Sequence, residues 1–185
     1  MPFVELKKSV PVFIAFNLVK KMTQSFEKLI SSIRMDVVET HGFMISGVNY
    51  EIVMLYWRIG RKIISEETAL NFSLDGFIDR LRDELKNEPL YNKLSFESND
   101  VKAMLALARN YPDDGYVEEV FTKLTWESIS ILILGVAQKY KRHWYARKAI
   151  LADWTPDDLR QAIARLQYEA RRRKPVSEFY VGLVG

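Results

Sequence analysis

Residues 48–65 read VNYEIVMLYWRIGRKIIS, and this stretch decides the fold class. Its apolar side chains recur every three or four positions, which places them along one face of an α-helix. The members of this stripe are Ile52, Leu55, Tyr56, Ile59 and Ile63. Gly60 interrupts the helix at a cost of about 1 kcal/mol relative to alanine, so we expect another backbone to cross closely there. We also expect Tyr56 and Trp57 to pack in the core rather than to line a ligand site.

The same periodicity continues outward from this stretch, and no internal repeat interrupts it. Local start signals are Ser73, Thr125 and Thr155, each of which can cap a helix. The apolar run Ile129–Val136 is hydrophobic all round, so we expect it at the centre of the core. Further helices are expected at about residues 26–42, 73–86, 97–110, 125–136, 139–151 and 155–173. The pattern predicts an all-α, compact multi-helix domain with helix-turn-helix-like elements.

Three regions are expected: an N-terminal extension or arm at 1–22, the helical domain at 23–174, and a C-terminal tail at 175–185. Residues 10–19 form an apolar run after Lys7 and Lys8. The run is too short to cross a membrane and lacks a small-residue cleavage site. We interpret it as a docked terminal strand, or alternatively as an arm that forms a homodimer.

The composition limits the chemistry that the chain can perform. Cysteine is absent, which excludes disulfides and thiolate metal sites and suits a cytoplasmic protein. His41 and His143 have no second ligand at metal-site spacing, so we expect structural histidines, no metal and no cofactor. No phosphate-binding glycine loop, nucleophile elbow or zinc-protease motif occurs.

Charge is distributed unevenly along the sequence. Residues 66–119 hold thirteen acidic and six basic side chains, whereas residues 136–174 hold eleven basic and four acidic ones. Clustered Lys and Arg with interleaved aromatic residues are typical of nucleic-acid binding. The predicted DNA-binding residues are Lys139, Lys141, Arg142, Arg147, Lys148, Arg171, Arg172 and Arg173. The alternative is a solvated helix face, with the three last arginines as a favourable cationic helix end.

Helical spacing divides the residues of the basic segment between different faces. Trp144, Lys148 and Leu151 fall near one face, and Arg142 and Tyr145 fall near another. Some of the aromatic side chains must therefore belong to the core.

Several of these segments resemble the N-terminal domain of the YhcG family. The stretch VNYEIVMLYWRIGR at 48–61 is similar to the family's run in which Asn precedes a Leu-Tyr-Trp-x-Ile-Gly-Arg core. Weaker matches follow in the expected order at Phe96–Val101, Met104–Pro112, Leu124–Trp126, Arg142–Tyr145 and Trp154–Leu159. The chain departs from the family at Leu105, where Arg is frequent, and at Tyr91–Leu94, which replaces a Gly-rich segment.

The resemblance covers roughly residues 25–173 and implies a helical DNA-binding domain that precedes a PDDEXK-type nuclease domain. The chain ends where that nuclease domain would begin, so we expect either a fragment or a stand-alone relative. The resemblance implies double-stranded DNA, and a nuclease domain or subunit, as partners.

A PDDEXK site needs an acid-x-Lys pair on a strand, next to a further acidic residue, to hold Mg²⁺ and orient water. Glu84–Lys86 matches that string but falls in a helical pattern, and Glu5–Lys7 is a weaker match. We therefore expect no enzyme but a noncatalytic DNA-binding or targeting domain. The alternative is a protein-interaction module that dimerises through its first two helices and uses its acidic middle against a basic partner.

Overall fold

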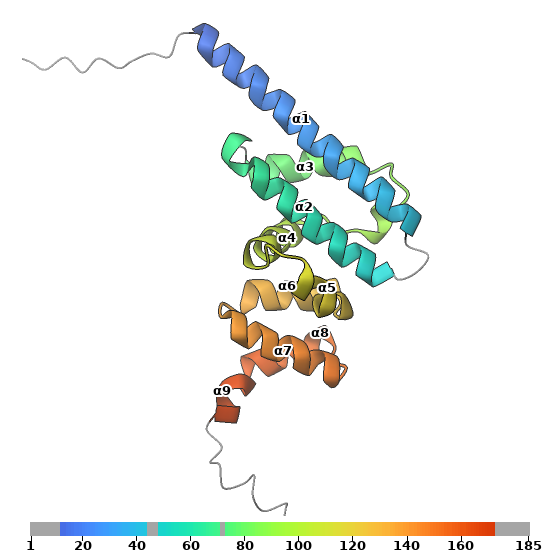
Figure 1. Cartoon of the computed structure of the whole chain (residues 1–185), viewed down its shortest axis with the longest axis vertical. Coiled ribbons are helices and arrows are strands. Elements are labelled where there is room, and N and C mark those ends of the chain that lie inside the picture. The colour runs from blue at the N-terminus through green and yellow to red at the C-terminus, as the bar shows by residue number, and fades with distance from the viewer. Residues whose placement is uncertain (1–11, 44–47, 71–72, 173–185) are drawn as a thin grey trace, which may run out of the picture.

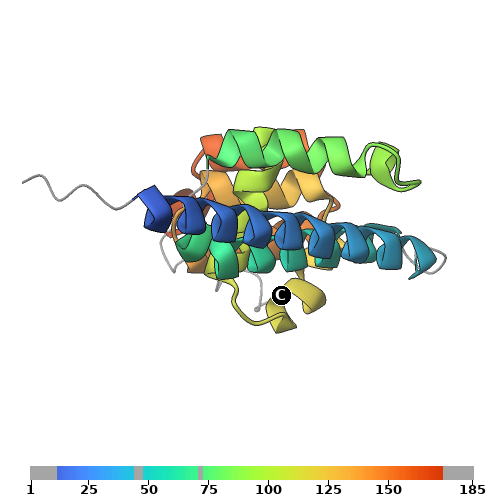
Figure 2. The same ribbon diagram turned by 90° about the horizontal axis from the view of Figure 1, so that it is seen from above.

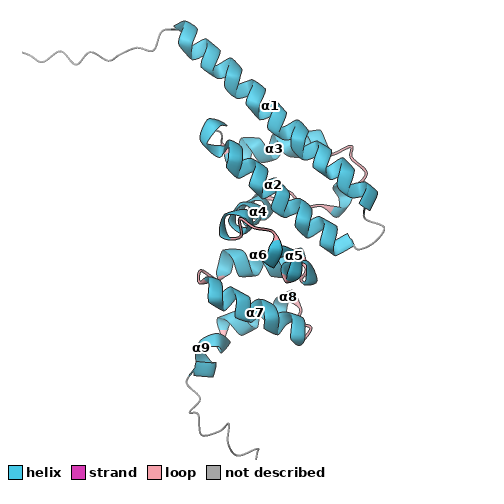
Figure 3. Ribbon diagram, in the orientation of Figure 1, coloured by secondary structure: helices cyan, strands magenta, loops and turns pink. Residues whose placement is uncertain are grey.

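A computed structural model describes residues 12–43, 48–70 and 73–172, and within these ranges the protein is all-α with no strand (Figure 3). The fold class predicted from the sequence is confirmed. The helices are α1 (Val12–Phe43), α2 (Val48–Leu70), α3 (Leu74–Leu85), α4 (Ser98–Asn110), α5 (Gly115–Glu119), α6 (Trp126–Gly135), α7 (Lys139–Leu151), α8 (Pro156–Ala164) and α9 (Gln167–Arg172). Short 3₁₀ turns occupy Tyr91–Lys93 and Phe121–Lys123.

Along the long axis of the molecule, α1 lies at one end and α9 at the other, with α2 and α3, then α4, then α5 and α6, then α7 and α8 between them (Figure 1). Seen from above, α1 lies across the stack and α3 runs beside it (Figure 2). Two hydrophobic clusters fill the stack, one mainly among α1–α4 and the other from α2 and α4 to α8. Trp126 packs against both clusters, so the two form one continuous interior. No described helix is long and apolar enough to cross a membrane.

Helix α2 lies between the two clusters and buries side chains toward both. Leu55, Tyr56 and Ile59 belong to the first cluster, and Val53 and Met54 belong to the second. Two buried faces explain why the α2 stretch is so rich in large apolar residues. The predictions that this stretch is a helix and that Tyr56 is a core residue are confirmed.

Gly60 marks the closest contact between α2 and α4. A Cβ atom added at Gly60 would lie 2.2 Å from the carbonyl oxygen of Met104 and 3.0 Å from the Cβ of Ala108. No real Cβ tolerates the first distance, and a backbone oxygen cannot rotate away as a flexible side chain can. The close crossing predicted from the glycine is confirmed.

Polar side chains of α2 hold distant loops against it. Asn49 donates its amide hydrogens to the carbonyl oxygens of Thr122 and Leu124, at 2.7 and 2.9 Å. The hydroxyl of Tyr56 accepts from the backbone amide of Ser95, at 2.6 Å. Together with the buried side chains of Phe121 and Phe96 in these loops, the hydrogen bonds fix where the chain re-enters the stack.

The helix starts predicted from capping residues agree with the structure. The Thr125 side chain accepts from the amide of Ser128 at 3.2 Å and opens α6. Thr155 and Asp158 form a reciprocal capping box that opens α8, with Pro156 at the first helical position. Ser73 precedes α3 in an extended conformation, although its side chain makes no capping hydrogen bond.

Two expectations about the chain ends were wrong. Residues 12–19 are helical and continue without a break into the rest of α1, so they are not a terminal strand. The single helix expected at 155–173 is two helices, because Leu166 adopts a left-handed conformation with φ of 50° and ends α8. Residues 1–11 and the predicted tail at 175–185 lie outside the described residues.

The run Ile129–Val136 was expected at the centre of the core, which is only partly correct. Ile129, Leu132 and Ile133 are buried, but Leu134 is 49% exposed. One side of α6 therefore faces solvent, while α4, α7 and α8 pack against its other sides.

We predict that Gly60→Ala lowers the free energy of unfolding by about 3 kcal/mol or prevents folding, since overpacking at rigid backbone costs about 1–3 kcal/mol and sometimes more. The matched control is Gly135→Ala, because a Cβ at Gly135 meets no atom within 4 Å. Urea unfolding followed by circular dichroism measures both variants. Equal stability of the two variants would contradict the close crossing.

Candidate nucleic-acid interface

Helix α7 carries most of the predicted DNA-binding residues, and its side chains divide between an inner and an outer face. Arg142, Tyr145, Ala146 and Ala149 are buried against the rest of the stack. The outer face has two rows at helical spacing, in agreement with the division predicted from the sequence. The first row is Lys139, His143 and Arg147, and the second is Tyr140, Trp144, Lys148 and Leu151.

Arg142 is a correction to the predicted DNA-binding set, because its side chain lies in the interior. The residue is 3% exposed, and its guanidinium donates to the carbonyl oxygens of Val136 and Ala137, both at 2.9 Å. It also donates to Oδ1 of Asn110 at 2.7 Å and to the Tyr111 hydroxyl at 3.4 Å. With its donors used internally, this guanidinium is not available to a phosphate group.

The burial of Arg142 follows from the helix ends around it. Its partners lie just past the C-terminus of α6 and at the C-terminus of α4, where carbonyl oxygens have no intrahelical donor. The negative end of a helix dipole favours a cation, so these two helix ends stabilise the charge without a carboxylate. The sequence feature that indicated this burial was the helical spacing, which placed Arg142 on the same face as Tyr145.

Lys141 is also engaged within the protein. Its ammonium forms an ion pair with the Glu169 carboxylate and lies 5.8 Å from the ring centroid of Tyr168. The hydrogen bond to Glu169 raises the pKa of Lys141 above its ordinary value. Lys141 therefore holds α9 against α7 and is a poor candidate for a phosphate contact.

Three predicted cations remain on the outer face of α7. Lys139, Arg147 and Lys148 are exposed, and none forms an ion pair with an acidic side chain in the described ranges. The Lys139 ammonium lies 5.1 Å from the ring centroid of Tyr111. The backbone of Arg171 and Arg172 is helical in α9, but their side chains lie outside the described part, as does Arg173 altogether.

His143 lies in an aromatic stack between α7 and α5. Its ring stacks on Tyr116 with centroids 3.9 Å apart, and it also contacts Tyr111 at 5.8 Å. Burial lowers the pKa of His143 below 6.5, and the cations Lys139, Arg142 and Arg147 lower it further. Burial also raises the pKa of Tyr116 to about 12. The sequence predicted a structural histidine at this position, but it did not predict the aromatic stack with Tyr116.

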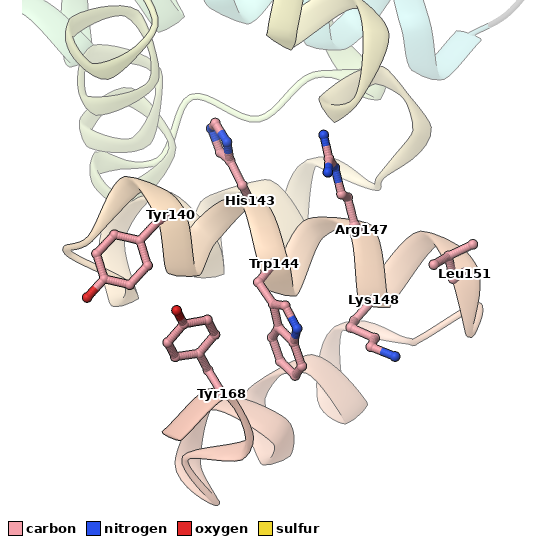
Figure 4. A pocket seen from close by; sticks show the side chains of 7 residues that line it. All are labelled: Tyr140, His143, Trp144, Arg147, Lys148, Leu151 and Tyr168. Atoms are coloured by element: carbon pink, nitrogen blue, oxygen red, sulfur yellow. The ribbon is translucent and has the colours of Figure 1, made fainter. Parts of the chain in front are cut away.

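A groove runs along the outer face of α7, with a volume of about 280 Å³. Figure 4 shows His143 and Arg147 directed to one side of α7, and Tyr140, Trp144 and Lys148 to the other, where Tyr168 lies beside Tyr140 and Trp144. Leu151 lies at the end of the groove. The aromatic wall of this groove consists of Tyr140, Trp144 and Tyr168. The sequence did not predict it, because Tyr168 is distant in sequence and comes from α9.

The possible nuclease string Glu84–Lys86 lies at the C-terminal end of α3, with Lys86 as the C-cap, and its middle residue Leu85 is fully buried. Glu84 and Lys86 are exposed. A PDDEXK centre has its acid-x-Lys pair on a strand, so the string does not have the geometry of that centre. Among the described residues, no three His, Asp or Glu side chains are grouped where they could hold a metal ion.

The fold and the site define an all-helical domain with a cationic, aromatic helix surface. The family model described as the DUF1016 N-terminal domain matches residues 32–170, and the chain belongs to this family, which includes the YhcG-like proteins. No curated protein and no solved structure matches the chain. The matched range extends from the second half of α1 to α9 and so includes α7 and its groove.

We predict that Arg142→Met lowers the free energy of unfolding by about 2–3 kcal/mol, because it leaves buried carbonyl oxygens without a donor. Arg147→Met on the same helix is the control and should change stability by no more than about 0.5 kcal/mol, since its side chain is exposed. Chemical denaturation compares the two. A variant at position 142 as stable as the control would show that its hydrogen bonds are dispensable.

We predict that His143 makes the stability of the protein depend on pH. Because its pKa is lowered in the folded chain, the unfolded chain takes up a proton first as the pH falls. Its contribution to stability is therefore complete above the ordinary histidine pKa of 6.5 and is lost as the pH falls through the lower folded value.

His143→Phe keeps an aromatic ring against Tyr116 and removes the titration. The unfolding free energy of this variant should fall less than that of the wild type between about pH 7.5 and pH 5.5. His41→Phe changes the only other histidine and serves as control. Parallel curves for wild type and His143→Phe would refute the assignment.

Proposed function

We propose that this chain is a noncatalytic DNA-binding or targeting domain, and that the outer face of α7 contacts the phosphate backbone. One observation carries the proposal: Lys139, Arg147 and Lys148 are exposed on α7, a helix that contains no acidic residue. Phosphate contacts by Lys and Arg supply most of the affinity of nonspecific DNA binding.

The spacing of these cations suits a nucleic-acid backbone. Lys139 and Arg147 are eight residues apart on the helix, which corresponds to about 12 Å along its axis. Phosphates on one DNA strand advance about 3.4 Å each along the duplex axis, so this length corresponds to three or four of them. Lys139 and Arg147 can therefore reach phosphates of one strand without a change in the helix.

A noncatalytic role is supported by the setting of the nuclease-like string in α3. Its acid and its lysine flank a buried leucine on a helix, which differs from the strand geometry that metal-dependent hydrolysis requires. In this proposal, cleavage belongs to a nuclease domain or subunit that the domain directs to DNA. Membership in the family supports that association as an expectation.

The test is the double variant Arg147→Glu, Lys148→Glu, measured by fluorescence anisotropy with a labelled DNA duplex. Wild type should bind with an affinity that falls steeply with salt. The double variant should lose at least about ten-fold in affinity, and the slope of log affinity against log salt should decrease by about 2.

The matched control is Lys93→Glu, Lys102→Glu, which makes the same change in net charge at two exposed lysines near the other cluster. It should bind DNA almost as wild type does. Equal losses in the two double variants would mean that total charge, and not the α7 face, determines binding.

A protein-interaction module is the second candidate, and exposed apolar side chains on α1 favour it. Val19, Met35 and Val38 are exposed on this long helix. If this candidate is correct, the chain binds no duplex at low salt, and light scattering gives about twice the monomer mass of 21.6 kDa. A monomer that binds the duplex excludes it.

A further inference from the structure

The groove on α7 combines aromatic side chains with cations, and this combination narrows the chemistry of its ligand. Its lining residues include Tyr140, Trp144, Lys148 and Tyr168 on one side of α7, and His143 and Arg147 on the other (Figure 4). Among the residues that the structure describes, no acidic side chain lines the groove. A ligand that matches this surface has a flat unsaturated ring and a negative charge, which describes a nucleotide.

The aromatic wall is formed by rings from two helices. The ring centroid of Tyr168 lies 5.7 Å from that of Tyr140, with the two rings tilted by 52°, and 5.6 Å from that of Trp144, in an edge-to-face arrangement at 79°. None of these pairs is stacked face to face. Tyr140 is 55% exposed, so more than half of this residue remains accessible to a ligand.

The wall is held in place by contacts behind it. The Lys141–Glu169 ion pair connects α7 to α9, and the backbone amide of Tyr168 donates to the Tyr145 hydroxyl at 3.3 Å. These contacts place Tyr168 opposite Tyr140 before any ligand arrives. A preformed wall loses little conformational entropy on binding.

The size of the groove limits the ligand to about one base. Its volume of about 280 Å³ is just below the range of about 300–1,000 Å³ typical of drug-sized ligands. The bases of a duplex are stacked on their neighbours, so their ring faces cannot reach the wall. An unpaired base can stack on it while adjacent phosphates remain near the cations.

We propose that this groove binds an unpaired nucleobase of single-stranded DNA, stacked on Tyr140, with Arg147 and Lys148 contacting the flanking phosphates. The proposal rests on the proposed function of the α7 face. It adds that this face distinguishes single strands, or locally opened duplex, from intact duplex.

Three labelled ligands test the proposal on the full chain: an oligothymidylate of about 12 nucleotides, an abasic strand of the same length, and a duplex. Wild type should bind the oligothymidylate at least about five-fold more tightly than the abasic strand, which has the same phosphates. Tyr140→Ala should remove most of this difference and leave duplex binding unchanged. Tyr50→Ala removes an exposed tyrosine on α2 and should behave as wild type.

A second variant tests the groove by tryptophan fluorescence quenching, a signal that a folding defect would not reproduce. Trp144→Phe keeps an aromatic ring in the wall and removes one of four tryptophans. It should bind the oligothymidylate as wild type does, but show less fluorescence quenching on binding. Unchanged quenching would place the base elsewhere and overturn the proposal.

The outcomes separate the two proposals. Equal binding of the thymidylate and abasic strands, with duplex binding that still depends on Arg147 and Lys148, overturns only the base-stacking groove. Absence of binding to all three ligands overturns both. A preference for the thymidylate strand that survives Tyr140→Ala also overturns the groove.

Discussion

The close crossing of α2 and α4 at Gly60 is the constraint on which the rest of the structure depends. It allows the Met104 carbonyl oxygen to approach α2 where any side chain would collide. The crossing fixes the direction of α4 and so the position of Tyr111 at its end. Tyr111 accepts from the Trp57 indole at 2.8 Å through its carbonyl oxygen and contacts Arg142 through its hydroxyl. The geometry of α7 is thereby connected to that of α2.

This connection changes how the basic C-terminal third should be interpreted. Arg142 stabilises two helix ends, Lys141 holds α9, and Arg160 pairs with Glu127 and Asp157. These cations are part of the structure, and the charge that remains for a partner is smaller than the sequence total suggests. Among the described cations of α7, Lys139, Arg147 and Lys148 remain exposed. The positions of the exposed cations, rather than the net charge of the segment, therefore determine which surface we propose for DNA binding.

Local signals predicted most of the fold. The apolar spacing of 48–65, the caps at Thr125 and Thr155, and the glycine in α2 all have direct physical consequences within a few residues. The break at Leu166 was not predictable in this way, because leucine has no preference for the left-handed conformation that it adopts. The burial of Arg142 was only partly predictable. Helical spacing placed this residue on the same face as Tyr145, but its hydrogen-bond partners come from the ends of α4 and α6, which the spacing does not reveal. The aromatic groove forms only because α9 packs back against α7, and no local sequence pattern predicts that contact.

The stretch that carries the family resemblance is a packing element. Tyr56 and Ile59 are buried in α2, Trp57 and Asn49 hold neighbouring segments by hydrogen bonds, and Gly60 permits the crossing. A match over this stretch therefore reports the fold, and it carries no direct information about a ligand. The surface of α7 is different, because exposed cations and an open tyrosine ring contribute little to stability. Residues that the fold does not need are where binding chemistry is expected, and here they share one groove.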